Sequence, residues 1–252
     1  MREISSAENK IFKHASQLLT KKYRDAYCEY LIEGPNLLDE AIKCGAEIET
    51  VFVSPDYDWE NMTEEAEQKG FMLSENLFKR LSETETAQGV IAVVKKAGGS
   101  FRFTMDHGGN FVVLDRLQDP GNIGTIIRTA DASGYGVLVM KGTADIYSSK
   151  VVRAAAGALF RVPIGFFDTV DELKSFTEKR GIRLCVTSMT AEKVYSQCCL
   201  SDTAIVIGNE GNGVSQEMFE KADFTVRIPM KGKTESLNAA VSAAILMYEN
   251  MR

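Results

Sequence analysis

The chain has 252 residues, of which 44% are hydrophobic and 25% charged, so it can bury a substantial core and is not disordered, collagen-like or a coiled coil. Its longest apolar run, Ala239 to Tyr248, is too short for a membrane span, and its N-terminus lacks the apolar segment of a signal peptide. Five cysteines without a CxxC pair and two distant histidines exclude HExxH metalloproteases and most Ser-His-Asp schemes. We therefore expect a cytoplasmic protein without a metal site or a membrane partner.

The net charge of −6 is distributed unevenly along the chain. Residues 1–24 carry six basic and two acidic side chains, whereas residues 25–97 carry six basic and 16 acidic ones. Residues 98–252 are electrically balanced. A basic segment on an acidic body is compatible with a polyanionic partner such as a nucleic acid.

A linker is predicted between Lys95 and Asn110, where two Gly-Gly pairs occur without clear hydrophobic periodicity. It divides the chain into two parts that are each of plausible domain size. We expect a small α/β domain at 1–97, a linker at 98–109 and a larger domain at 110–252.

The N-terminal part mixes helices and strands. An amphipathic pattern over Asn9 to Lys22 predicts a helix with apolar side chains on one side and basic side chains on the other. A second helix is expected over Pro35 to Lys43, ended by Gly45. Short runs of β-branched and aromatic residues predict strands at Tyr30–Glu33, Thr50–Val53 and Gly89–Val94.

The C-terminal part alternates short apolar runs with helical patterns. The predicted strands are Phe111–Leu114, Gly136–Met140, Arg161–Phe166, Ile182–Thr187, Ala204–Ile207 and Phe224–Ile228. The predicted helices are Asn122–Ser133, Lys150–Leu159, Val170–Arg180, Ser215–Lys221 and Ser236–Glu249. Nearly all-apolar strands that alternate with helices indicate a parallel sheet covered on both faces. Ligands of such sheets bind beyond the carboxyl ends of the strands, so the loops after Leu114, Ile207 and Ile228 are the candidates.

The first of these loops carries the turn sequence Asp119-Pro120-Gly121-Asn122, and Asn122 is placed to cap the helix that follows. Arg128 lies about 1.5 helical turns further on, within reach of the same site. The alternative interpretation is an ordinary turn with a helix cap and a surface arginine.

The second loop is rich in glycine. Gly208, Gly211 and Gly213 permit close backbone approach, and no Lys-Ser/Thr follows them, so the loop is not a P-loop. Glu210 stands among the glycines, where a carboxylate would repel phosphate and favours a cationic or hydroxylated ligand. A plain glycine-rich turn is the alternative.

The third loop precedes the last helix. Gly232-Lys233-Thr234 resembles part of a Walker A motif, but Arg227 stands where its first glycine would be, which excludes that motif. An N-cap role explains Ser236, but it explains neither Asn238 nor the preceding Pro229-Met230.

Together the segments DPGNIGTIIRTADASG, IGNEGNGVS and IPMKGKTESLNAAVSAA resemble, in the family's order, the three motifs of the SpoU/TrmH family of RNA ribose 2′-O-methyltransferases. The segments IEGPNLLDEAI and ETETAQGVIAVV resemble the family's small L30e-like substrate-binding domain. The resemblance implies a SPOUT α/β fold whose C-terminal end forms a deep trefoil knot. It also implies S-adenosylmethionine as cofactor and a homodimer with the site at the subunit interface.

The resemblance further assigns roles to residues at matching positions of this chain. The implied catalytic residues are Asn122, Arg128, Glu210, Ser236 and Asn238. The implied cofactor-binding residues are Gly208, Asn209, Gly213, Ile228, Met230, Ser236 and Leu237. Because a guanidinium stays protonated in proteins, we expect Arg128 to clamp a phosphate and stabilise the developing alkoxide, not to act as the base.

The function that the resemblance implies is methylation of a ribose 2′-OH in structured RNA, with 23S ribosomal RNA as the expected substrate. Transfer RNA is the alternative substrate, and an RNA-binding protein that has lost catalysis is the alternative function. The basic residues of the first predicted helix are the expected RNA contacts, and a merely solvated helix face is the alternative. These residues are Lys10, Lys13, Lys21, Lys22 and Arg24.

Overall fold

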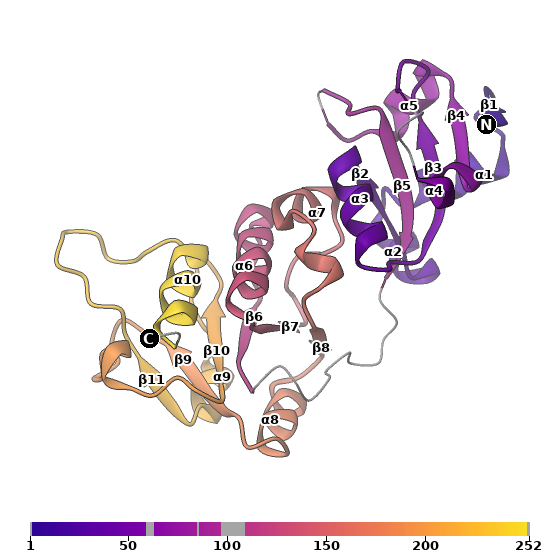
Figure 1. Ribbon diagram of the computed structural model, residues 1–252. Coiled ribbons are helices and arrows are strands. Elements are labelled where there is room, and N and C mark those ends of the chain that lie inside the picture. Colours follow the sequence, from indigo (N-terminus) through magenta and orange to yellow (C-terminus); the bar gives the residue numbers. More distant parts are fainter. Residues whose placement is uncertain (1, 59–62, 85, 97–108, 251–252) are drawn as a thin grey trace. The chain divides into compact units, whose positions relative to one another are not determined.

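The computed structural model describes residues 2–58, 63–84, 86–96 and 109–250, apart from the side chain of Glu65 (Figure 1). The chain forms two compact units. The first comprises Met1–Gly99 and Tyr147–Phe160, and the second comprises Ser100–Ile146 and Arg161–Arg252. All but one residue of the expected linker, 98–109, lie outside the described residues.

The first unit is built on a mixed sheet of five strands in the order β1-β4-β3-β5-β2. Its strands are β1 (Arg2–Ile4), β2 (Glu29–Glu33), β3 (Ile48–Val53), β4 (Gly70–Leu73) and β5 (Val90–Lys95). Its helices are α1 (Lys10–Gln17), α2 (Lys21–Tyr27), α3 (Pro35–Lys43), α4 (Glu64–Gln68), α5 (Glu75–Leu81) and α7 (Ser149–Ala155). Strand β5 runs antiparallel to both β2 and β3, while β1, β3 and β4 are parallel to one another. The side chains of α1 and α5 pack with those of β3 and β5 in one core.

The single helix predicted over Asn9–Lys22 is wrong, because the chain leaves the helix after Gln17 and begins α2 at Lys21. Asn9, where the predicted helix begins, is the N-cap of α1. The helix is interrupted before α2, where Thr20 adopts an extended backbone with φ −109° and ψ 141°. The break turns Arg24 inward, where its Nη1 donates a hydrogen bond of 2.7 Å to the carbonyl of Leu18. The carbonyl of Leu18, which lacks a hydrogen-bond partner within a helix, thus accepts a hydrogen bond from a side chain.

The helix predicted over Lys150–Leu159 is also interrupted. Helix α7 ends at Ala155, since Ala156 and Gly157 adopt positive φ angles of 47° and 87°, and a short 3-10 turn follows at Ala158–Phe160. This segment belongs to the first unit, where α7 packs against β2.

The second unit is a six-stranded, wholly parallel sheet in the order β11-β9-β10-β6-β7-β8, which confirms the expected fold class. Its strands are β6 (Phe111–Asp115), β7 (Gly136–Met140), β8 (Ile164–Phe167), β9 (Arg183–Thr187), β10 (Thr203–Gly208) and β11 (Phe224–Val226). Its helices are α6 (Pro120–Ser133), α8 (Val170–Glu178), α9 (Gln216–Lys221) and α10 (Ala239–Glu249).

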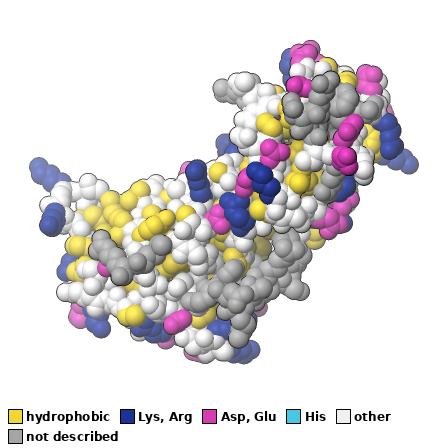
Figure 2. Space-filling view, in the orientation of Figure 1, with side chains coloured by type: hydrophobic (Ala, Val, Ile, Leu, Met, Phe, Trp, Pro, Cys, Tyr) yellow, Lys and Arg dark blue, Asp and Glu magenta, His cyan; other side chains and the backbone are white. Residues whose placement is uncertain are grey.

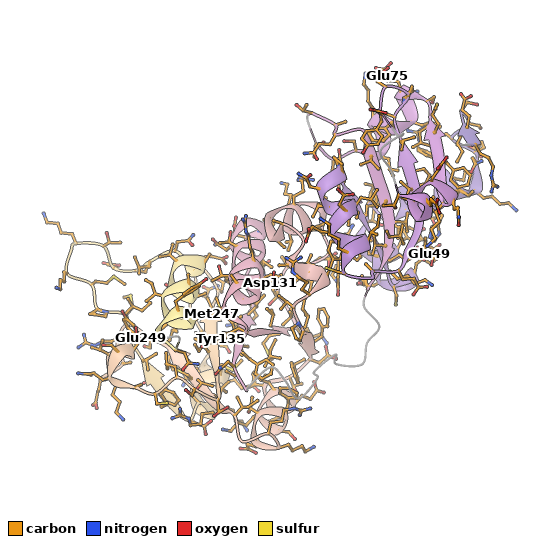
Figure 3. All side chains as sticks on the ribbon, viewed as in Figure 1. Glu49, Glu75, Asp131, Tyr135, Met247 and Glu249 are labelled. Atoms are coloured by element: carbon orange, nitrogen blue, oxygen red, sulfur yellow. The ribbon has the colours of Figure 1, made fainter. Side chains whose placement is uncertain are left out.

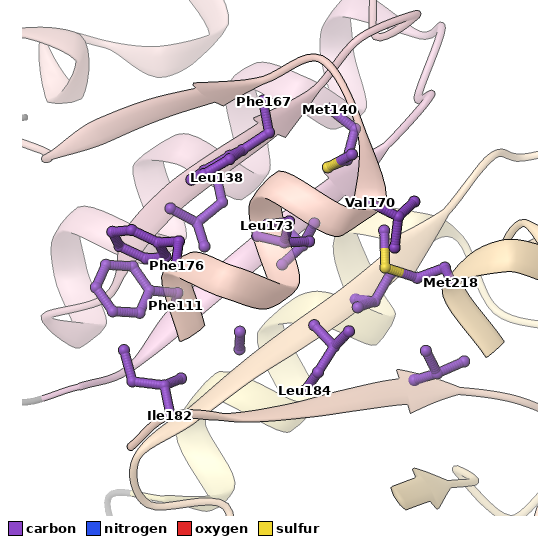
Figure 4. Close-up of a cluster of buried hydrophobic side chains, with 14 residues drawn as sticks. Phe111, Leu138, Met140, Phe167, Val170, Leu173, Phe176, Ile182, Leu184 and Met218 are labelled. Carbon is purple, nitrogen blue, oxygen red and sulfur yellow. The ribbon is translucent and has the colours of Figure 1, made fainter. Parts of the chain in front are cut away.

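Helices cover both faces of this sheet because the strand side chains alternate between the faces. On one face Leu138, Leu184 and their neighbours pack against α8 and α9 in the hydrophobic cluster that Figure 4 shows. Helices α6 and α10 cover the other face and pack along each other. Ser133 of α6 lies 3.7 Å from the sulfur of Met247, which is labelled in Figure 3.

Four elements of the first unit give no clear signal in the sequence: β1, β4, α4 and α5. Each of these elements has seven residues or fewer. Strand β1 lies at the edge of the sheet and pairs with β4, which pairs in turn with β3. Over the described residues, no helix is long and apolar enough to cross a membrane.

Replacing Leu173 by alanine should lower the free energy of unfolding by about 2–5 kcal/mol, because this leucine is fully buried at the centre of the α8 cluster. Ser175→Ala, on the exposed side of the same helix, should change it by less than about 0.5 kcal/mol. Urea unfolding followed by circular dichroism measures both values. Equal stabilities of the two variants would contradict this description of the core.

Candidate active site

Three loops meet at the carboxyl edge of the parallel sheet. The loop after β6 covers residues 116–119, the glycine-rich loop after β10 covers 209–215, and the long loop after β11 covers 227–238. Strands β6 and β10 are neighbours in register, with Asp115 opposite Gly208, so the first two loops leave the sheet side by side. The third loop returns from β11 at the sheet edge to begin α10 (Figure 1).

Hydrogen bonds between side chains join the three loops at Asn122. Its Nδ2 donates to Oε1 of Glu210 at 3.1 Å, and its Oδ1 accepts from Nδ2 of Asn238 at 2.8 Å. Glu210 and Asn238 follow Asn122 by 88 and 116 positions in the sequence, yet they are held in one small cluster with it. The structure thus brings together Asn122, Glu210 and Asn238, three of the residues to which the resemblance assigns a catalytic role.

Glu210 is an ionised anchor of this cluster. Besides Asn122, its carboxylate accepts hydrogen bonds from the backbone N–H groups of Gln118 and Asp119, each at 3.2 Å. Burial raises the pKa of Glu210, but the hydrogen bonds from Asn122 and from the backbone outweigh it and bring the pKa below the ordinary value of 4.5. The group is consequently a carboxylate at neutral pH.

The glycine-rich loop closes on itself through Asn209. The backbone N–H of Asn209 donates to the carbonyl of Gly213 at 3.0 Å, and the N–H of Gly213 donates back at 2.8 Å. The Oδ1 of Asn209 accepts from the N–H groups of Gly211 and Asn212, and its Nδ2 donates to the carbonyl of Arg116 at 2.9 Å. Both the side chain and the backbone of Asn209 thus serve to fix the loop.

Asp115 is a buried carboxylate at the end of β6 that the sequence reasoning missed. It is 2% exposed, and its Oδ2 accepts from the N–H of Ser215 at 2.7 Å. Its Oδ1 accepts from Nε of Arg116 at 3.0 Å. The signal was an acidic residue that directly ends an apolar strand. Its effect is to tie the end of the glycine-rich loop to the first loop.

A pocket of about 700 Å³ opens between the second and third loops. All seven residues expected to bind a cofactor line it, namely Gly208, Asn209, Gly213, Ile228, Met230, Ser236 and Leu237. Glu210 and Asn238 also line it, so the hydrogen-bonded cluster forms part of its wall. Thr187, Ser188 and Met189 complete one side, and these were missed although β9 ends at the same edge of the sheet.

Two helix caps differ from the expected ones. Asp119, not Asn122, caps α6, since its Oδ1 accepts from the N–H of Asn122 at 2.7 Å. Asn238, not Ser236, caps α10, and its Oδ1 accepts from the N–H groups of Ala240 and Val241. Because Asp119 performs the capping, the side chain of Asn122 is free to join Glu210 and Asn238.

Arg128 is not part of this cluster within one chain. It is exposed on α6 and lies about 120° around the helix axis from Asn122. No hydrogen bond or ion pair joins its guanidinium to any residue that the structure describes.

The expected RNA contacts divide into two groups. Lys10, Lys13, Lys21 and Lys22 reach the surface of α1 and α2; Lys13 pairs with Glu8, and Lys21 pairs with Asp25 at 2.8 Å. Arg24 is wrong as an RNA contact, because it is 7% exposed and its guanidinium serves the carbonyl of Leu18. Among the described residues, no group of three or more His, Cys, Asp or Glu side chains is arranged to hold a metal.

Gly208 should tolerate no side chain. A Cβ there would lie 2.3 Å from the backbone nitrogen of Val214, whereas a Cβ at Gly211 would meet nothing closer than 3.6 Å. Gly208→Ala should therefore displace the loop and lower the melting temperature by several degrees, about as expected for 1–3 kcal/mol of overpacking. Gly211→Ala serves as the matched control and should melt like the parent protein in differential scanning calorimetry. Equal melting temperatures would contradict the close approach at Gly208.

Comparison with known proteins agrees with the geometry of the site. The SpoU rRNA methylase family matches residues 109–248, and the MRM3-like substrate binding domain matches residues 9–92. The 23S rRNA (guanosine(2553)-2′-O)-methyltransferase RlmP of Bacillus subtilis is 36% identical over 98% of both chains.

Solved structures give the same result. An rRNA methyltransferase from Sinorhizobium meliloti has a TM-score of 0.86 at 28% identity and covers 99% of this chain and 96% of its own. The SpoU methyltransferase AviRb from Streptomyces viridochromogenes, in complex with the cofactor AdoMet, has a TM-score of 0.85 at 29% identity and covers 96% of this chain and 97% of its own. The resemblance inferred from the three loops is confirmed, and the chain belongs to the SpoU rRNA methylase family.

Proposed function

We propose that this protein transfers a methyl group from S-adenosylmethionine to a ribose 2′-OH of ribosomal RNA. The observation that carries the proposal is the cluster of Asn122, Glu210 and Asn238 in the wall of the 700 Å³ pocket. The relative from Bacillus subtilis, named for action on 23S rRNA, supports the substrate, and the AdoMet complex of AviRb supports the donor. A function in the methylation of ribosomal RNA in turn supports a cytoplasmic location of the protein.

The pocket fits S-adenosylmethionine in size and in the chemistry of its lining. Drug-sized ligands occupy pockets of about 300–1,000 Å³, and the pocket here falls within that range. Phe219, Ile228 and Leu237 offer apolar surface for an adenine, while the glycine-rich loop offers backbone groups. Among the described lining residues none is Lys or Arg, and Glu210 is ionised, which suits a cation better than a phosphate. The sulfonium of the donor supplies a methyl group that is already activated for displacement.

The residues of this chain add alignment. The amides of Asn122 and Asn238 are each held by hydrogen bonds at both the oxygen and the nitrogen, and the second N–H of each NH₂ group can orient a hydroxyl. The exposed Ser236, on the third loop, also lines the pocket. Holding the ribose oxygen in line with the methyl carbon can contribute about 7–11 kcal/mol to catalysis. Glu210 fixes this geometry through its three donors and is a positioning residue.

We assign a second subunit to this site as well. Val241 and Tyr248 of α10, seven residues apart on one side of the helix, are each 46% exposed. Figure 2 shows hydrophobic side chains gathered over this region of the second unit. An exposed apolar face of this kind is typical of an interface between subunits. A homodimer through α10 and the neighbouring α6 would let the partner subunit's Arg128 reach the cluster that it does not reach within its own chain. Family membership also supports the expected trefoil knot at the C-terminal end.

Methyl transfer from labelled S-adenosylmethionine to 23S rRNA tests the function and the role of Arg128 together. Arg128→Ala should lower the single-turnover rate by about 100-fold or more, as does loss of one donor to a developing oxyanion. Arg128→Lys should recover little of it, because an ammonium cannot replace the two-pronged guanidinium. Arg180→Lys, two residues after the end of α8, is the control and should keep the parent rate.

The possible outcomes test the function, the substrate class and the role of Arg128 separately. No transfer by the parent protein to any rRNA or tRNA would overturn the proposed function, and transfer to tRNA alone would change the substrate class. Near-full activity of Arg128→Lys would overturn only the clamp.

The dimer is tested by placing charge on its proposed interface. The double variant Val241→Glu and Tyr248→Glu should sediment with the mass of one chain, 27.8 kDa, in place of twice that mass. Methyl transfer should fall with dimerisation, since the partner subunit's Arg128 is then missing. Ser175→Glu, on the exposed side of α8, is the control and should stay dimeric. A fully active monomer would contradict the shared site, and an unchanged dimer would contradict the interface.

A further inference from the structure

Three aromatic rings form a connected group on α1 and α2 of the first unit. The ring centroids of His14 and Tyr27 are 4.6 Å apart, and those of Tyr23 and Tyr27 are 5.8 Å apart at an angle of 24°. Tyr27 thus contacts both of the others. We refer to His14, Tyr23 and Tyr27 as the ring platform.

The ring platform is accessible to solvent. Tyr27 is 39% exposed, and in the described part of the first unit it is the one large hydrophobic side chain that reaches this degree of exposure. The side chain of His14 is 40% exposed. The other large apolar side chains in the described part of the unit are buried or partly buried, so the exposure of Tyr27 is not a general property of this fold.

Hydrogen bonds at the polar edges hold two of the rings in place. The hydroxyl of Tyr27 donates to Oε1 of Gln17 at 3.0 Å. The Nε2 of His14 lies 2.5 Å from a carboxylate oxygen of Glu29, whose residue is only 9% exposed. The rings are therefore ordered before any ligand arrives, which reduces the entropy lost on binding.

The surroundings of the ring platform are the most basic part of an acidic unit. Residues 1–24 carry six basic and two acidic side chains, against six and 16 in residues 25–97. Lys22 lies over the ring of Tyr23 at 5.6 Å from its centroid and makes no ion pair with any described residue. The nearby Asp25 is neutralised by Lys21 and Lys96, at 2.8 and 2.7 Å. Glu8 forms an ion pair with Lys13, and Glu29 is hydrogen-bonded to His14.

We infer that the ring platform stacks an unpaired base of the RNA substrate, while Lys22 contacts the adjoining phosphate. Proteins read single-stranded RNA by stacking its bases on aromatic side chains next to cations, because every base presents a π face. The inference rests on the proposed function, since it concerns the same RNA. It also gives the lysines of α1 and α2 a purpose that charge alone did not specify.

The test is binding of protein-free 23S rRNA transcript by Tyr27→Ala and Tyr27→Phe, measured by filter binding over a range of salt concentrations. Loss of one stacked base should weaken binding by about five- to 150-fold. Tyr27→Phe keeps the ring and should bind within about two-fold of the parent protein. In methyl transfer, Tyr27→Ala should raise KM for the RNA and leave kcat unchanged.

Salt dependence separates stacking from charge. Tyr27→Ala should shift the plot of log affinity against log salt downward without changing its slope, because no phosphate contact is lost. Lys22→Ala should reduce the slope by about 0.7–0.9, the value for one phosphate contact. An unchanged affinity of Tyr27→Ala, or equal losses for Tyr27→Ala and Tyr27→Phe, would overturn the inference and leave a protein partner for this surface.

Folding and function are controlled separately. Circular dichroism and binding of S-adenosylmethionine show whether Tyr27→Ala is folded, and Tyr23→Ala, expected to weaken RNA binding in the same direction, replaces it if it is not. If the parent protein neither binds nor methylates RNA, the proposed function fails. If the parent protein methylates rRNA and the variants bind it equally well, only the stacking inference fails.

Discussion

The site depends on one carboxylate, that of Glu210. It accepts hydrogen bonds from Asn122 and from the backbone at Gln118 and Asp119, and so joins the loop after β10 to the loop after β6. Asn122 passes the connection on to Asn238 at the start of α10. Because a loop of glycines has little conformational preference of its own, these contacts are what give the pocket a fixed wall.

A second carboxylate, that of Asp115, also holds the glycine-rich loop in place. Asp115 is buried at the end of β6, and its hydrogen bond to the N–H of Ser215 holds the far end of the glycine-rich loop. Gly208 permits this arrangement, since a side chain there would collide with the backbone of Val214. Acidic side chains thus hold the loop near both of its ends, and Gly208, the last residue of β10, leaves room for the backbone of Val214.

The parallel sheet of the second unit was predictable because its strands are continuous apolar runs, and β7 matches its predicted bounds. Local sequence did not decide between competing polar residues. Asp119 and Asn122 are both good caps, and only the folded chain shows that Asp119 caps α6 while Asn122 turns to Glu210. Arg24 looked like a surface cation, yet the break before α2 buries it. The pocket residues Thr187 to Met189 carry no motif, and only the strand order brings them to the site.

The arrangement also limits how the proposed reaction can proceed. A carboxylate that already accepts three hydrogen bonds and whose pKa is lowered is a weak base, so Glu210 is poorly suited to take the proton of a ribose hydroxyl. A guanidinium remains protonated and cannot take it either. The side chains gathered here are amides, a hydroxyl and a paired carboxylate, which orient a hydroxyl and stabilise charge. We therefore propose that catalysis at this site rests on alignment of the ribose oxygen and on stabilisation of the charge that develops on it, with the hydroxyl proton passing to solvent water.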